Sequence, residues 1–267
     1  MNKKLLVVFL GALAAGTVNV NAQAPTPAPA PAPAAPSSSW TVTPAFVSQY
    51  MFRGTRLGGP GFQPAVEFDS GPVVAGVWTN FPVADKVVGQ SDPEFDLYGS
   101  YKETINDSLN FVTGFTYYYY PSADKKSGFY KRTFEPNVAV NYTVGALTLT
   151  PKVYYDVILS GPTYEFNAAY TVPLKSAGTE LDFAGNVGTF KWNNAAPNAS
   201  PDLKNYGNYW LLGVSAPFQI TKDSKFSLGW AYTKGSGNYL KQGSAPKTLN
   251  TAAVGRGVVT ISYAVSF

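Results

Sequence analysis

The chain has 267 residues, a formal net charge of +4, no cysteine and no histidine, and 13% of its residues are charged, against about 25% in an average soluble domain. The missing cysteines exclude disulfides and thiolate sites, and the small net charge gives no reason to expect nucleic acid as a partner. With 18 Tyr, 17 Phe and 25 Gly, the composition favours an all-β chain embedded in a membrane.

The first residues have the pattern of a cleavable secretory signal. Lys3 and Lys4 precede a short apolar run, and small residues follow up to Ala22. The run is too short for a helix that crosses a bilayer, which needs about 20 apolar residues. We therefore predict a signal peptide over residues 1–22.

Residues 23–39 are rich in proline and alanine and end in three serines. This composition cannot bury a core and favours an extended, polyproline-like segment. We predict a periplasmic linker here, and the alternative is a segment that enters the folded domain or contacts the cell wall.

Residues 40–267 alternate apolar and polar side chains in stretches of strand length. No segment here is long and apolar enough for a membrane helix, so a membrane-spanning chain must close its sheet and leave no edge in lipid. We predict an all-β fold, a closed antiparallel transmembrane β-barrel of about twelve strands. The predicted strands are 40–53, 62–69, 73–81, 94–102, 108–120, 130–142, 147–157, 163–172, 180–190, 209–218, 225–233 and 254–267.

The connections between these strands alternate in length. The short ones are 69–72, 103–107, 143–146, 175–179 and 219–224, and those that alternate with them, mostly longer, are 54–61, 82–93, 121–129, 191–208 and 234–253. Outer-membrane barrels have short periplasmic turns and longer extracellular loops, so we predict this orientation with both chain ends in the periplasm.

The two faces of the predicted strands differ in polarity. We assign the apolar face to lipid: Phe46, Phe52, Leu109, Phe111, Phe115, Val138, Val140, Leu149, Val153, Phe226, Leu228 and Trp230. We assign the polar face to a lumen, with these charged residues as pore-lining candidates: Arg53, Glu67, Glu94, Asp96, Lys102, Lys152, Asp156, Glu165, Asp182 and Arg256. The same residues are expected to form a lattice of opposite charges.

Two local features need a separate explanation. Pro44, Pro64, Pro136 and Pro151 fall inside predicted strands, where we expect bulges or displaced strand ends. Tyr117 to Tyr120 fall at the outer end of a strand, which favours an aromatic girdle over a platform that stacks sugars.

The last predicted strand alternates strictly and ends on Phe267. This ending is typical of the closing strand of outer-membrane barrels. We predict that Ile261, Tyr263, Val265 and Phe267 form the signal for the barrel-assembly machinery.

Catalysis has little support in this sequence. Without histidine, Ser–His and Asp–His mechanisms and histidine zinc sites are excluded. The carboxylate pairs Glu67 with Asp69 and Glu94 with Asp96 share a strand face, but a charge lattice explains them better than acid–base chemistry. We predict no enzyme activity, no catalytic residue, no metal and no cofactor.

Several motifs resemble the TorF-like putative porins of Gram-negative outer membranes. They are Ser48-Gln49-Tyr50-Met51-Phe52-Arg53-Gly54, Gln63-Pro64-Ala65-Val66, Ala75-Gly76-Val77-Trp78 and Phe95-Asp96-Leu97-Tyr98-Gly99, with weaker matches at 164–166 and 211–215. Gln49 stands where the family often has an acidic residue. The resemblance implies an outer-membrane barrel more firmly than any particular solute.

The function we predict is passive diffusion of small hydrophilic solutes through a porin-like channel in the bacterial outer membrane. With about twelve strands, its lumen should be narrower than that of porins with about 16–18 strands. The alternative is a non-conducting structural or surface barrel whose lumen is closed by salt bridges or by the linker. Expected partners are outer-membrane lipid and lipopolysaccharide, the barrel-assembly machinery and the solutes.

The predicted outer loops carry more basic than acidic residues. The basic ones are Arg56, Lys86, Lys125, Lys126, Lys191, Lys204, Lys234, Lys241 and Lys247. We expect these residues to contact phosphates of lipopolysaccharide, and the alternative is a mouth that attracts anionic solutes.

Overall fold

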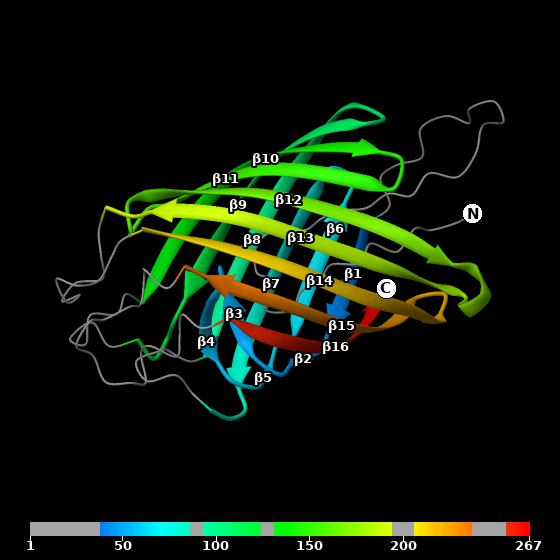
Figure 1. Cartoon of the computed structure of the whole chain (residues 1–267), viewed down its shortest axis with the longest axis horizontal. Helices are drawn as coiled ribbons and strands as arrows, with labels where there is room; N and C mark the ends of the chain where they lie inside the picture. The colour runs from blue at the N-terminus through cyan, green and yellow to red at the C-terminus, as the bar shows by residue number, and fades with distance from the viewer. Residues whose placement is uncertain (1–37, 86–92, 124–130, 194–205, 237–254) are drawn as a thin grey trace.

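The structure, a computed structural model, describes residues 38–85, 93–123, 131–193, 206–236 and 255–267. These residues form a closed antiparallel β-barrel of 12 strands and a separate two-stranded sheet. Figure 1 shows the strands side by side around the wall. Within the same ranges, no helix is long and apolar enough to cross a membrane.

The wall strands follow one another around the barrel in chain order. They are β1 (Ser38–Thr43) with β2 (Ala45–Val47), β5 (Gly61–Phe62) with β6 (Ala65–Ser70), β7 (Val73–Pro82), β8 (Glu94–Asn106), β9 (Leu109–Tyr119), β10 (Arg132–Val144), β11 (Leu147–Asp156), β12 (Gly161–Leu174), β13 (Thr179–Lys191), β14 (Tyr206–Thr221), β15 (Ser224–Gly235) and β16 (Arg256–Ser266).

The last strand closes the barrel on the first. β16 pairs with β1 through Thr41 and Ser266, and with β2 through Phe46 and Ile261. Beyond this register, the backbones of Trp40 and Phe267 exchange two hydrogen bonds of 3.3 and 2.8 Å. The prediction of a closed antiparallel barrel is confirmed.

Pro44 and Pro64 interrupt the first two wall strands at the same level. The register Thr43 with Ala65 and Phe46 with Phe62 places the two prolines opposite each other. Because Gln63 N donates to Ala45 O at 2.8 Å, the adjacent proline pair is a non-hydrogen-bonded one. At a non-hydrogen-bonded pair, neither proline would need an N–H to bond to the opposite strand. The first two wall strands therefore stay paired without a bulge at these positions.

The other two strand prolines each keep their place in the ladder with one neighbouring strand, although the β10–β11 register is interrupted at Pro151. Pro136 pairs with Phe115 and Pro151 with Phe166, each inside a continuous register. In the described residues the register shifts fall elsewhere, at Thr104/Asn106, Gln219/Thr221 and Tyr50/Met51. The expectation of displaced strand ends is confirmed at Pro44 and Pro64, and the expectation of bulges is wrong.

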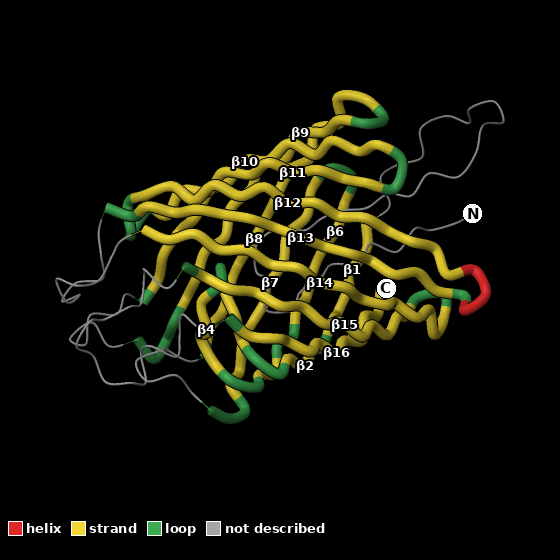
Figure 2. Tube along the Cα trace, viewed as in Figure 1, coloured by secondary structure: helices red, strands yellow, loops and turns green. Residues whose placement is uncertain are grey.

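The short turns lie together at one end of the barrel. They join β6 to β7, β8 to β9, β10 to β11 and β14 to β15, and the β12–β13 connection contains the 3-10 helix η2 (Lys175–Ala177). Figure 2 shows this end, with η2 in red. At the opposite end, β11 and β12 are joined by residues 157–160. The predicted short turns are confirmed, whereas the orientation in the membrane stays a prediction.

The two faces of the wall separate by polarity. Large apolar side chains such as Phe46, Phe111 and Leu228 are exposed on the outside, while threonine, asparagine and charged residues point inward. Phe52 is an exception: its ring contacts the ring of Tyr118, which is buried on the inner face, at a centroid distance of 6.3 Å. Its assignment to lipid is therefore wrong.

The tyrosine run at 117–120 divides between the two faces. Tyr119 is exposed on the outside, whereas Tyr118 is buried inside and Tyr120 donates a hydrogen bond to Glu94. Strict alternation explains this split. The prediction of one aromatic girdle made of all four tyrosines is wrong.

The predicted signal peptide lies outside the described residues. The same is true of most of the predicted linker, because β1 already begins at Ser38.

Candidate functional site

A short hairpin leaves the wall after β2. β3 (Tyr50–Phe52) and β4 (Thr55–Gly58) pair with each other, and the chain rejoins the wall at β5. Arg53 and Gly54 form the turn, with φ of 47° and 73°, as a tight hairpin of two residues requires. The predictions of a wall strand as far as residue 53 and of an outer loop at 54–61 are therefore wrong.

The base of the hairpin packs on the inner wall. Tyr50 and Met51 are buried in one apolar cluster with Val47, Ala65 and Trp78, and the rings of Tyr50 and Trp78 lie 5.7 Å apart. These wall residues come from β2, β6 and β7. The apolar contact accounts for the apolar side chains that this part of the wall points inward.

The tip of the hairpin reaches the other side of the barrel. Arg53 Nη1 and Nη2 donate to Glu135 Oε1 and Oε2 on β10 at 2.8 and 2.9 Å. The guanidinium carbon lies 4.7 Å from the ring centroid of Tyr154 on β11. Gly235 N at the end of β15 donates to Gly54 O at 2.9 Å. The hairpin therefore spans the lumen from one wall to the opposite one.

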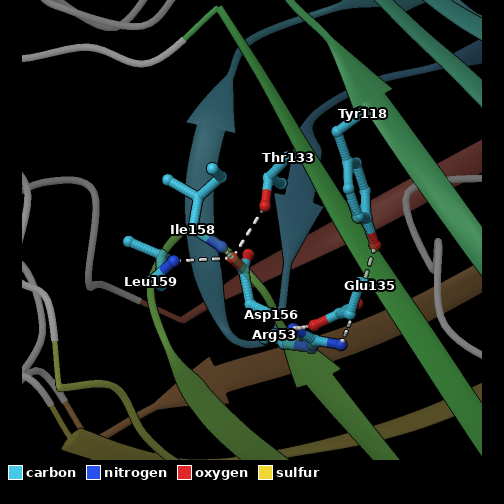
Figure 3. A network of polar contacts seen from close by, with 7 residues as sticks. All are labelled: Arg53, Tyr118, Thr133, Glu135, Asp156, Ile158 and Leu159. Carbon is cyan, nitrogen blue, oxygen red and sulfur yellow. Dashed lines mark hydrogen bonds and ion pairs between the residues drawn. The ribbon is translucent and has the colours of Figure 1, made fainter.

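Figure 3 shows the convergence of side chains at this tip. Tyr118 donates to Glu135 Oε2 at 3.0 Å, so this carboxylate is held by a phenol as well as a guanidinium. Nearby, Asp156 Oδ1 accepts from Thr133 Oγ1 at 2.7 Å and from the backbone N–H groups of Ile158 and Leu159 at 2.9 and 2.7 Å. Both carboxylates are thus fixed in place by several donors.

Acidic side chains outnumber basic ones on this part of the inner face. Five carboxylates of the described wall strands are each at most 4% exposed: Glu94, Asp96, Glu135, Asp156 and Glu165. Among the described residues, Arg53 and Lys152 are the cations near Glu135 and Glu165, and Lys152 Nζ lies 4.6 Å from the Tyr154 ring centroid. Because these side chains are buried, Coulomb interactions between them are stronger than at an exposed surface.

The pore-lining candidates fall into two groups. Arg53 forms the tip of the hairpin, and the wall residues on the side that the tip reaches are Glu94, Asp96, Lys152, Asp156 and Glu165. Within the described part of the chain, Glu67, Lys102, Asp182 and Arg256 make no hydrogen bond or ion pair with the tip residue Arg53; Glu67 accepts from Tyr98 at 2.9 Å and Asp182 from Thr171 at 2.8 Å.

Three residues of this site were missed or misplaced from the sequence. Glu135 was not among the candidates, although its strand parity, the same as that of Asn137, could have shown its inward direction. Tyr118 was assigned to the girdle. Arg56, expected in an outer loop, is buried in the hairpin, where it donates to Gln49 at 2.6 Å and pairs with Asp85.

The wall and the hairpin together define a class of protein. A closed barrel with an apolar outer face and a polar lumen is the architecture of porin-like outer-membrane β-barrels. Two solved structures share this fold: the KdgM porin, with a TM-score of 0.52 and 10% identity over 85% of this chain and 99% of that one, and the NanC porin, with 0.51 and 9% over 85% and 98%. The fold supports the bacterial outer membrane as the location of the chain.

The chain belongs to the Gcw_chp family, described as bacterial proteins of unknown function, whose model matches residues 33–254. No curated protein matches the chain.

Proposed function

We propose that this chain is a narrow porin-like channel through which small hydrophilic solutes diffuse passively across the outer membrane. The observation that carries the proposal is the β3–β4 hairpin, which crosses the lumen and gathers charged side chains around its tip. Such a constriction selects solutes by size and charge, as charged rings do in other pores.

The pore-lining candidates are part of this proposal. Those at the hairpin would set selectivity, and Glu67, Lys102, Asp182 and Arg256 would line the rest of the path. The buried carboxylates accept hydrogen bonds from tyrosine, threonine and arginine. This arrangement supports a charge lattice rather than acid–base catalysis.

The same hairpin favours a second candidate, a non-conducting structural barrel. The bidentate pair between Arg53 and Glu135 joins the hairpin to the far wall, with side chains 4% and 1% exposed. A barrel closed in this way would serve the envelope without conducting.

Assembly through the C-terminal strand is a further part of the proposal. Ile261, Tyr263 and Phe267 are exposed on the outer face at the barrel seam, and Val265 shares their parity. This placement leaves their side chains accessible to the barrel-assembly machinery during insertion.

Single-channel recording in planar bilayers separates the two candidates. The mature protein is compared with a variant in which residues 50–58 are replaced by a short glycine–serine linker, after heat-modifiable gel migration has verified folding. A channel gives stable steps, and we expect the variant to conduct at least about twice as much because the constriction is gone. Steps in the variant alone support the plugged structural barrel, and silence of both folded proteins rejects conduction.

A further inference from the structure

We propose that the inner wall around Glu135 is a binding site for solutes that carry a guanidinium group, and that Arg53 occupies this site as an internal ligand. The inference rests on the proposed channel and deepens it, since it names the class of solute that the constriction recognises. It also makes the hairpin a competitor of that solute.

The contacts of Arg53 are those of a guanidinium receptor. The planar group meets a carboxylate with two parallel hydrogen bonds of 2.8 and 2.9 Å and lies 4.7 Å from a tyrosine ring. Glu135 is also held by the Tyr118 hydroxyl, which donates to Oε2, the same oxygen that accepts from Arg53 Nη2. Bidentate carboxylate pairing combined with aromatic contact is specific for guanidinium, because an ammonium cannot form the fork.

Among the described residues, buried acidic side chains outnumber the basic ones around this site. In the described part of the chain, five buried carboxylates lie on strands β8 to β12, and Arg53 and Lys152 are the basic side chains near Glu135 and Glu165. Asp96, which is 2% exposed and close to Glu94 and Glu135, has an Oδ1 atom without a hydrogen-bond partner among the described residues. A buried carboxylate oxygen without a donor is costly, so a mobile cation from solution would be stabilised here.

Exchange of ligands is easier than simple opening of the hairpin. Withdrawal of Arg53 alone would leave Glu135 buried and unpaired, which is strongly unfavourable. A solute guanidinium that enters as Arg53 leaves would restore both hydrogen bonds and the ring contact. The hydrogen bond from Gly235 N to Gly54 O would still hold the turn to the end of β15.

Binding by variants of Arg53 tests the proposal. Calorimetry on folded protein in detergent compares methylguanidinium with methylammonium, two cations of equal charge that differ in the fork. Arg53→Ala should bind methylguanidinium at least about tenfold more tightly than wild type does, because the internal ligand is gone. Methylammonium should bind Arg53→Ala more weakly than methylguanidinium does.

The matched control is Arg53→Ala combined with Glu135→Gln, which should lose the gain in affinity. Equal binding by the single and double variants, or no preference between the two cations, would overturn the proposal. If Arg53→Ala does not fold, Arg53→Lys replaces it, since lysine keeps the charge without the fork, and Glu135→Gln serves as its control. These binding measurements do not depend on conduction. A barrel that binds methylguanidinium but does not conduct would therefore refute the proposed channel and still support the binding site.

Discussion

The two ends of the lumen are held together in different ways. At the end with the short turns, side chains bond across neighbouring strands, as Asn141 does to Asn110 and Thr150 to Asn141, both at 2.7 Å. At the hairpin end, Arg53 bonds to Glu135, 82 positions away along the chain and on the opposite wall. The first kind of contact reinforces the wall itself, and the second narrows the lumen and concentrates charge there.

The largest effect should come from breaking the contact across the lumen. Arg53→Ala leaves Glu135 buried without its cation, and loss of one partner of a buried pair costs about 3–5 kcal/mol. The measurement is urea-induced unfolding in lipid vesicles, followed by heat-modifiable migration. Adding Glu135→Gln should recover part of the loss. If the unfolding free energy of Arg53→Ala lies within about 0.5 kcal/mol of that of wild type, the contact across the lumen does not stabilise the barrel.

Substitutions in β10 should affect stability according to the face of the barrel wall on which they lie. Val140 is exposed on the outside of β10, and Asn141 is its inward neighbour. Val140→Lys should destabilise folding into vesicles by about 2–4 kcal/mol, while Asn141→Lys should lose only its hydrogen bonds, about 1 kcal/mol. Equal effects in the same unfolding assay would show that the faces of β10 are wrongly assigned.

Two turn glycines allow a direct comparison of the ends. Gly54 and Gly145 both have positive φ, 73° and 59°, but a Cβ on Gly54 would lie 2.3 Å from Gly235 N, whereas one on Gly145 meets nothing within 4 Å. Gly145→Ala should cost only backbone strain, about 1–2 kcal/mol. Gly54→Ala should cost more and also change the single-channel conductance, because the tip must move off β15. Identical stability and conductance of the two variants would argue against close packing of the hairpin tip on β15.

The smallest effects should come from the lattice between neighbouring strands. Asn141→Ala and Thr150→Ala each remove hydrogen bonds worth about 1 kcal/mol, and their effects should be coupled because the residues share a bond. A double-mutant cycle of urea unfolding measures this coupling. We expect conductance to stay unchanged, and an altered conductance would show that this end also controls passage.

Alternation predicted the location of the wall strands better than their ends. The strand predicted at 94–102 is observed as Glu94–Asn106, and the one at 163–172 as Gly161–Leu174. The hydrogen-bonded ladder depends on the backbone alone, so pairing can continue where the side chains no longer alternate in polarity. The polarity pattern therefore ends before the hydrogen-bonded ladder does.

The hairpin escaped prediction for a different reason. Tyr50, Met51 and Phe52 continue the apolar character of the preceding strand, but they pack on the inner wall rather than on lipid. In one dimension, an apolar residue buried inside the barrel looks the same as one that faces acyl chains. Arg53 and Gly54 were assigned to the end of a strand and the start of a loop, although together they form the turn.

The sequence by itself determined the closed barrel and the assignment of most side chains to its two faces, because a period of two residues is a local property of an extended chain. Only the tertiary structure decided that the Arg53 guanidinium meets Glu135 and Tyr154. That choice depends on how the strands close around the lumen and how far a short hairpin reaches across it, and neither is encoded in the spacing of residues along one strand.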